Sequence, residues 1–191
     1  MPPRPRITKE NIIDAAVAVI RESGFENVNA RTVSQKLHCS TQPVMYHFAT
    51  IDSLKRAAFA WVDRVHGESL MRISPEQDPI LGIGLNYVRF AVEEPQLFRF
   101  LFQSGYAEEN SLLEMIHSEE LIPVLAAMQE ATGLSMEKTR QLFLTVALFA
   151  HGYASILVNN GLEYEEKTVA EHLERAWNGA FLEATQGGEP L

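Results

Sequence analysis

The sequence has a single cysteine, Cys39, so no disulfide can form within the chain, as is typical of a reducing compartment. Its first residues, MPPRPRITKE, lack the apolar segment of a secretory signal. No unbroken apolar run approaches the roughly 18 residues that a membrane-spanning helix needs. These absences predict a cytoplasmic protein with no membrane partner.

Motifs of the common enzyme classes are also missing. We find no P-loop, no H-E-x-x-H zinc motif, no G-x-S-x-G nucleophile turn and no cysteine pair. Gly82 and Gly84 lack the third glycine of a dinucleotide fingerprint and lie in a helical pattern. His117, Glu119 and Glu120 match no familiar metal-ligand spacing, and a solvated helix face explains them better. The sequence therefore predicts no enzyme, no cofactor and no metal site.

Positive charge is scarce overall, since the net charge is −9, but it is unevenly distributed. Residues 1–56 carry eight Lys or Arg against five Asp or Glu, whereas residues 57–191 carry eight against twenty. A basic end on an acidic body is what a protein needs when only one end approaches nucleic-acid phosphates. Chance unevenness is the alternative, and charge alone does not decide between the two.

Apolar residues recur with helical spacing along the whole chain, so an all-α fold is predicted. Thr8 is expected to cap the first helix and Gly24 to end it. Pro123 predicts a kink or a break within its helix. The expected helices cover residues 9–23, 30–37, 41–48, 51–71, 80–93, 96–104, 111–131, 136–159 and 165–184.

Residues 30–48 form two short predicted helices joined by a tight turn, which is the plan of a helix-turn-helix. His38 stands at the turn, and histidine is one of the few non-glycine residues enriched at positive φ. Ser40 is expected to cap the second helix by accepting from the Gln42 N–H, since Pro43 has no N–H. The residues predicted to face inward are Val33, Leu37, Val44 and Phe48, and those predicted to face outward are Thr41, Gln42, Tyr46 and His47.

A family resemblance rests on this segment and on the helix before it. The run Ile12-Ile13-Asp14-Ala15-Ala16, then Gly24-Phe25, then Leu37-His38-Cys39-Ser40-Thr41-Gln42-Pro43-Val44-Met45-Tyr46-His47-Phe48, resembles the N-terminal domain of the tetracycline-repressor (TetR) family. The resemblance covers about residues 8–56. It implies a homodimeric transcription regulator, in most cases a repressor, that binds a palindromic operator and is released by a small molecule.

The same resemblance implies two domains, both helical. Residues 1–56 would be the helix-turn-helix DNA-binding domain, and residues 57–191 the ligand-binding and dimerisation domain. The positions that match the base-reading and backbone-contacting residues of the family are Arg31, Thr41, Gln42, Pro43, Tyr46, His47, Thr50 and Lys55.

Three positions depart from the family pattern: His38, Met45 and Ile51 stand where the family commonly has Gly, Tyr and Lys. Lys55, one turn after Ile51, can replace the missing cation. The departures leave an alternative open, in which a helical small-molecule-binding protein keeps a degenerate helix-turn-helix that does not read DNA specifically. The Pro-rich arm with Arg4 and Arg6 either reaches an adjacent minor groove or is a solvated tail.

The rest of the chain is rich in aromatic residues on predicted helices, which is more often plain core than a ligand cavity. The resemblance favours a cavity for a largely apolar ligand between these helices. The predicted ligand-binding residues are Phe90, Phe98, Phe102, Met115, Phe143 and His151. A lone histidine such as His151 on an apolar face is otherwise a structural residue.

The last two helices carry apolar stripes that are expected to form a dimer interface. One stripe is Val146, Ala150, Ala154 and Leu157, and the other is Val169, Leu173, Trp177, Ala180 and Phe181. Four such helices from two subunits would pack as a bundle. The alternative is that the stripes close the core of each subunit.

Overall fold

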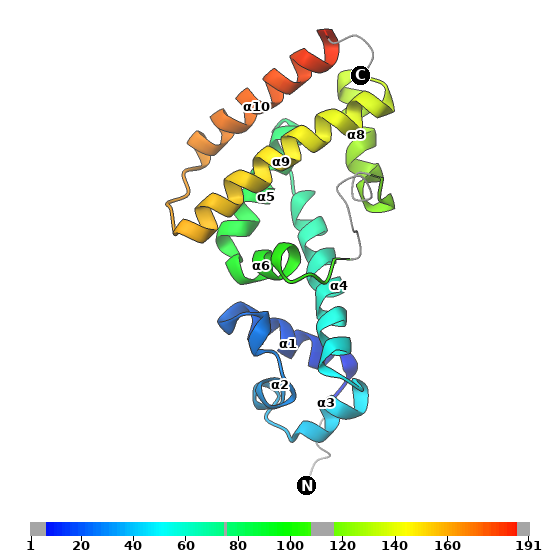
Figure 1. Ribbon diagram of the computed structural model, residues 1–191, viewed down its shortest axis with the longest axis vertical. Coiled ribbons are helices and arrows are strands. Elements are labelled where there is room, and N and C mark those ends of the chain that lie inside the picture. The colour runs from blue at the N-terminus through cyan, green and yellow to red at the C-terminus, as the bar shows by residue number, and fades with distance from the viewer. Residues whose placement is uncertain (1–6, 75, 108–116, 187–191) are drawn as a thin grey trace. The chain divides into compact units, whose positions relative to one another are not determined.

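The structure is a computed structural model that describes residues 7–74, 76–107 and 117–186. All regular secondary structure in these residues is helical, as predicted. The chain divides into two compact units (Figure 1). Unit 1 comprises residues 1–68 and 94–107, and unit 2 comprises residues 69–93 and 108–191.

Unit 1 is built around the first helix, α1. A capping box starts it, with the Asn11 N–H donating to the Thr8 Oγ1 and the Thr8 N–H donating to the Asn11 side chain. Gly24 ends it with a φ of 90°, a conformation that favours glycine. The helices of unit 1 are α1 (Lys9–Ser23), η1 (Phe25–Asn27), α2 (Ala30–Lys36), α3 (Thr41–His47), α4 (Ile51–Leu70) and α6 (Pro95–Gln103). The last two residues of α4, after Glu68, belong to unit 2.

The core of unit 1 joins α1 to a helix that comes much later in the sequence. α6 packs against α1, and Arg21 donates from Nε to both carboxylate oxygens of Glu94 at 3.1 and 3.0 Å. Phe100 of α6 is fully buried, stacked on Phe25 with 5.5 Å between ring centroids and edge-on to Phe59 at 5.6 Å. Unit 1 is therefore larger than the predicted DNA-binding domain of residues 1–56.

Unit 2 is a group of helices around α9. α9 packs against α5, α8 and α10, and α10 also contacts α5. Pro123 lies in the first turn of α8, directly after a 3₁₀ turn, so the described part of the predicted helix 111–131 does break there. Residues 108–116 lie outside the described residues. The helices of unit 2 are α5 (Pro79–Glu93), η2 (Glu119–Leu121), α8 (Ile122–Thr132), α9 (Met136–Asn160) and α10 (Glu166–Gln186).

Among the described residues, one helix, α9, is long and apolar enough by length and composition to cross a membrane. A single helix of this kind is weak evidence for a membrane protein, because core helices have the same composition. This helix packs against α5, α8 and α10, and 22% of its most apolar window is buried.

Candidate functional site

The turn between α2 and α3 holds the two helices of the motif together. His38 has a φ of 50°, the only positive value among the described non-glycine residues, and confirms the predicted turn. The Cys39 N–H donates back to the Ser34 carbonyl at 3.0 Å. Val33 and Val44 are fully buried, one from each helix, so an apolar contact surface sets the angle between α2 and α3.

The outer face of α3 carries the side chains that the sequence assigned to base reading. Thr41, Gln42, Met45 and Tyr46 are exposed, and Tyr46 keeps 81% of its surface in contact with solvent. Pro43 is half-buried. Gln can pair bidentately with adenine and the threonine methyl can contact thymine, so this face has the chemistry of a recognition helix.

The start of α3 differs from the prediction. Ser40 takes the predicted N-cap position, but its side chain makes no cap hydrogen bond, so the predicted bond from the Gln42 N–H is wrong. Ser40 is exposed, so water can accept hydrogen bonds from the first backbone N–H groups of α3.

Two predicted phosphate contacts lie at helix N-termini. Arg31 is exposed in the first turn of α2, which Asn29 caps by accepting from the Arg31 and Thr32 amides. Thr50 caps α4 by accepting from the Ser53 N–H at 3.0 Å. Anions are favoured at helix N-termini, so both positions suit a DNA backbone.

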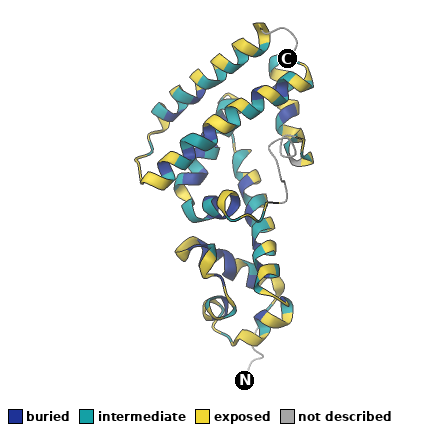
Figure 2. Cartoon of the chain, viewed as in Figure 1, coloured by how far each residue is buried: buried dark blue, intermediate teal, exposed yellow. Residues whose placement is uncertain are grey.

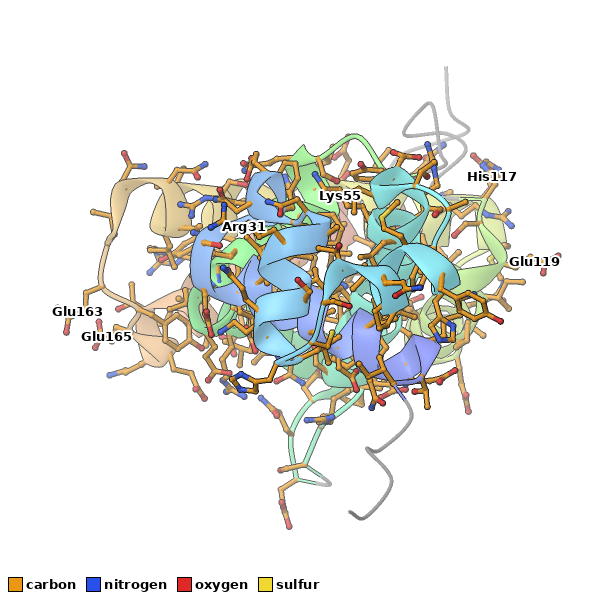
Figure 3. The ribbon with its side chains drawn as sticks, turned by 90° about the horizontal axis from the view of Figure 1, so that it is seen from below. Arg31, Lys55, His117, Glu119, Glu163 and Glu165 are labelled. Atoms are coloured by element: carbon orange, nitrogen blue, oxygen red, sulfur yellow. The ribbon has the colours of Figure 1, made fainter. Side chains whose placement is uncertain are left out.

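Lys55, the proposed replacement for the missing cation at position 51, is half-buried on α4 (Figure 3). Its Nζ lies 6.0 Å from the Phe25 ring centroid, within the range of a cation–π contact. The ammonium group of Lys55 is thus directed toward the Phe25 ring of the same unit.

Several cations of the basic N-terminal region are paired with acids of the same unit. Lys36 pairs with Glu22, and Arg56 donates from Nε to Asp52 at 3.0 Å. The Tyr106 hydroxyl donates to the other oxygen of Asp52 at 3.1 Å. The Arg56 and Tyr106 hydrogen bonds, in that order, lower the pKa of Asp52. These pairs offset part of the positive charge that the count of Lys and Arg in residues 1–56 suggested.

His47, predicted to contact the DNA backbone, makes an interaction inside the unit. Its Nε2 lies 3.1 Å from the carbonyl oxygen of Ile7, forty residues earlier in the chain. A carbonyl only accepts hydrogen bonds, so Nε2 carries the proton. The side chain is half-buried, with its ring edge-on to Tyr46 at 5.2 Å between centroids.

The predicted ligand-binding residues fall into two units. Phe98 and Phe102 belong to α6 of unit 1, while Phe90, Phe143 and His151 belong to α5 and α9 of unit 2. Met115 lies outside the described residues. Phe90 and Phe98 are buried, Phe143 and His151 are half-buried, and Phe102 is 40% exposed.

In unit 2, a polar pair joins α5 to α9. The Tyr87 hydroxyl of α5 lies 2.8 Å from His151 Nδ1 of α9. Burial raises the pKa of Tyr87 and lowers the pKa of His151, so both groups are neutral at pH 7. Tyr87 was absent from the predicted site, because nothing in the spacing of residues 87 and 151 links the two helices.

The family model of the tetracyclin repressor-like C-terminal domain matches residues 80–178, more than half of the chain. The chain belongs to the TetR family. No curated protein gives a significant sequence match.

Solved structures of TetR-family proteins have the same fold. A TetR-like transcriptional regulator from Rhodococcus sp. RHA1 has a TM-score of 0.65 and 18% identity, covering 97% of this chain and 100% of that one. A tetracycline repressor variant from Acinetobacter baumannii AYE, in complex with minocycline, has a TM-score of 0.64 and 13% identity, with coverages of 96% and 98%. The multidrug binding protein EbrR, complexed with ethidium, has a TM-score of 0.59 and 22% identity, with coverages of 88% and 97%.

The predicted dimer stripes of this TetR-family chain are only partly buried in the structure. Ala150, Ala154 and Leu157 of α9 are buried within the single chain, and so are Val169 and Leu173 of α10. These five residues contribute to the subunit's own core. The other four, Val146, Trp177, Ala180 and Phe181, are half-buried, so the dimer interface stays a prediction. Exposed stretches run along both helices (Figure 2). The large apolar residues among the exposed ones are Leu148, Phe149, Ile156 and Leu182.

Glycines lie beside these exposed residues. A Cβ added at Gly152 of α9 or at Gly179 of α10 would meet nothing within 4 Å. Open space at a helix glycine allows another backbone to approach closely. We refer to Leu148, Phe149, Ile156 and Leu182 as the outer apolar face.

Proposed function

We propose that this TetR-family protein is a cytoplasmic, homodimeric transcription regulator, in its basal state a repressor, that a small and largely apolar ligand releases from DNA. The observation that carries the proposal is the exposed face of α3, where Thr41, Gln42 and Tyr46 project from a buried helix-turn-helix scaffold. Side chains of this kind on a rigid short helix serve to read base edges in the major groove.

The residues around α3 have distinct roles in this proposal. Gln42 pairs with a base edge, Thr41 and Pro43 contact base methyl groups, and Tyr46 contacts a base or the adjacent sugar. The residues that hold the DNA backbone are Arg31, His47, Thr50 and Lys55. Backbone contacts set the register of α3, and the base contacts select the sequence.

In this proposal, the protein dimerises through the outer apolar face, and the symmetry of the dimer determines the symmetry of the operator. A two-fold dimer presents two copies of α3 about 34–36 Å apart, so each enters a successive turn of the major groove. The operator is then a palindrome. The support for this proposal is the apolar character of Leu148, Phe149 and Ile156 on an exposed helix, where a monomer would keep polar residues.

The ligand site is proposed to include Phe90, Phe143 and the Tyr87–His151 pair, all of unit 2. The aromatic rings supply apolar contact, and the neutral polar pair supplies one hydrogen-bonding group that orients a ligand. Such a ligand releases the DNA only if it binds the DNA-free conformation more tightly than the DNA-bound one.

The first experiment selects duplex DNA from a random pool with the purified full-length protein at moderate salt. We expect enrichment of a palindrome, and we expect Gln42→Ala or Tyr46→Ala to abolish it. Gln103→Ala is the matched control, because Gln103 is also exposed but lies on α6. Weak, salt-sensitive binding with no enriched sequence would instead support a small-molecule-binding protein with a degenerate helix-turn-helix.

A second experiment tests the ligand site by thermal shift with apolar compounds, including ethidium and minocycline, which two structural neighbours bind. A binder at 100 times its Kd stabilises the native state by about 2.7 kcal/mol, so its shift should be readily measured. We expect His151→Phe and Tyr87→Phe to reduce the shift. Tyr153→Phe is the control, since Tyr153 forms the other tyrosine–histidine pair of α9, with His172. An equal shift in all variants would place the ligand elsewhere.

A further inference from the structure

Arg56 of α4 is held by one partner on its own helix and by one from a distant segment of unit 1. Its Nε donates to Asp52 Oδ2 at 3.0 Å, across the i, i+4 spacing of one helical turn. Its Cζ lies over the ring of Tyr106, 5.5 Å from the centroid. The Tyr106 hydroxyl donates to the other oxygen of Asp52 at 3.1 Å, so the three side chains contact one another. The guanidinium group is therefore fixed, although the Arg56 side chain is 62% exposed.

Tyr106 is itself anchored in the aromatic core of unit 1. Its ring centroid lies 5.9 Å from that of Phe100 and 6.4 Å from that of Phe59. Gly105, between α6 and Tyr106, has a φ of 74°, a conformation that favours glycine. The ring that lies under the Arg56 guanidinium thus has a fixed place in unit 1.

These contacts bring the positive charge of Arg56 to the first turn of α4. Side chains on an α-helix point toward its N-terminus, and Arg56 reaches back to Asp52, the second residue of α4. Thr50, a predicted contact of the DNA backbone, caps the same end of this helix. The ion pair uses Nε, which leaves Nη1 and Nη2 for another acceptor. A planar cation with neighbouring N–H groups matches the geometry of a phosphate.

The other candidate cation of this helix end is directed elsewhere. Ile51 stands where the family commonly has Lys, and Lys55 directs its ammonium group toward the Phe25 ring. An exposed ion pair within one helix contributes little to stability. The main consequence of the Asp52–Arg56 pair is therefore the position that it gives to the guanidinium group.

We propose that Arg56 binds a phosphate of the DNA backbone through Nη1 and Nη2, and that Asp52 and Tyr106 are positioning residues for its guanidinium group. This inference rests on the proposed function, because it adds a contact to the DNA that α3 reads. It also gives the segment after α6 a part in DNA binding. A side chain that is already ordered loses less conformational entropy on binding than a free one, which strengthens its contribution to affinity.

The test measures binding of the full-length protein to the selected operator and to an unrelated duplex over a range of salt concentrations. Arg56→Gln should reduce the magnitude of the slope of log K against log salt by about 0.9 per half-site, the value of one phosphate contact. Affinity for the operator should fall about three- to tenfold per half-site, the range of one net hydrogen bond. Arg64→Gln is the matched control, because Arg64 forms another exposed i, i+4 ion pair on α4, with Glu68, about two turns farther along the helix. The control should leave slope and affinity unchanged.

A double variant separates a phosphate contact from simple neutralisation of charge. Asp52→Asn removes the negative charge with which Arg56 pairs. If Arg56 binds phosphate directly, Asp52→Asn combined with Arg56→Gln keeps a slope below that of the wild type. If Arg56 only neutralises Asp52, the double variant recovers the wild-type slope and affinity, and this result would overturn the contact.

The positioning role of Tyr106 is tested by its coupling to Arg56. Tyr106→Leu removes the ring under the guanidinium group and should weaken binding, whereas Tyr106→Phe keeps the ring and should keep most of the affinity. Neither change should have a further effect once Arg56 is replaced by Gln. Additive effects of Tyr106→Leu and Arg56→Gln would overturn the positioning role.

The Arg56 contact and the proposed function fail in different ways. An Arg56→Gln variant that behaves like Arg64→Gln on both duplexes would overturn the Arg56 contact and leave the regulator proposal standing. A wild-type protein that selects no operator would overturn the proposed function. The Arg56 contact would then still be decided on the unrelated duplex, because phosphate contacts do not depend on base sequence.

Discussion

Single residues of the helix-turn-helix were the best predicted part of the molecule. The positive φ of His38 and the burial of Val33 and Val44 follow from local chemistry, and the structure confirms them. Ser40 is the N-cap of α3 as predicted, but its predicted hydrogen bond is absent, because an exposed helix end does not require a side-chain partner. The Tyr87–His151 and His47–Ile7 contacts were beyond prediction, since they join positions 64 and 40 residues apart.

The buried histidine of α4 makes the stability of the protein depend on pH. His66 is 7% exposed and its ring lies edge-on to Phe102 at 5.6 Å between centroids. Burial lowers the pKa of His66 to about 4, whereas an unfolded histidine has a pKa near 6.5. Below pH 6.5 the unfolded chain takes up a proton at His66 that the folded chain does not, so acid favours unfolding.

We therefore expect the free energy of unfolding to fall by about 3 kcal/mol between pH 6.5 and pH 4 because of His66. Urea denaturation at several pH values should show this slope, and His66→Gln should remove it. His117→Gln, at an exposed histidine, should leave the slope unchanged. A slope that persists in His66→Gln would assign the acid sensitivity to other groups.

At the level of helices, the apolar periodicity predicted the bounds of most helices well. It predicted less well which side of a helix is buried. The predicted helix 136–159 is observed as Met136–Asn160, and 165–184 as Glu166–Gln186. α9, however, is apolar on more than one side, with Ala154 fully buried and Ile156 58% exposed. Periodicity finds apolar stripes but cannot say which one meets the subunit's own core.

The outer apolar face leads to a prediction about assembly. Leu148→Glu combined with Ile156→Glu should convert the proposed dimer into a folded monomer, because two charges cannot be buried unpaired in an interface. Sedimentation velocity measures the change, and circular dichroism should show unchanged helix content. Leu162→Glu is the control, since Leu162 is also exposed but lies in the loop after α9. A double variant that stays dimeric would place the interface elsewhere.

For the whole molecule, the sequence correctly indicated an all-α chain of the TetR family but not how its helices are grouped. α6 lies more than forty residues after α3, yet it belongs to the same unit. A boundary at residue 56 was natural from sequence, because the basic region and the recognisable motif both end there. The burial of Phe100 against Phe25 and Phe59 is a long-range contact that no local pattern contains.

The grouping predicts that a change in α6 destabilises the DNA-binding helices. Phe100→Ala should cost about 3–5 kcal/mol in the free energy of unfolding, the usual range for a buried phenylalanine. Hydrogen exchange of the α1 and α2 amides should accelerate in the same variant. Phe102→Ala on the same helix should cost less, because Phe102 is 40% exposed. If exchange in α1 and α2 is unchanged, residues 1–56 fold independently of α6.

Unit 1 consists of two separate stretches of the chain, and this affects how it can fold during synthesis. A nascent chain leaves the ribosome from its N-terminus, and Phe25 and Phe59 are complete well before Phe100 has been translated. During that interval the aromatic surface that Phe100 covers has no native partner. A chimera that kept residues 1–56 of this chain without its α6 would leave Phe25 without Phe100 permanently. Viable chimeras should therefore keep the helix-turn-helix region together with the α6 of the same chain.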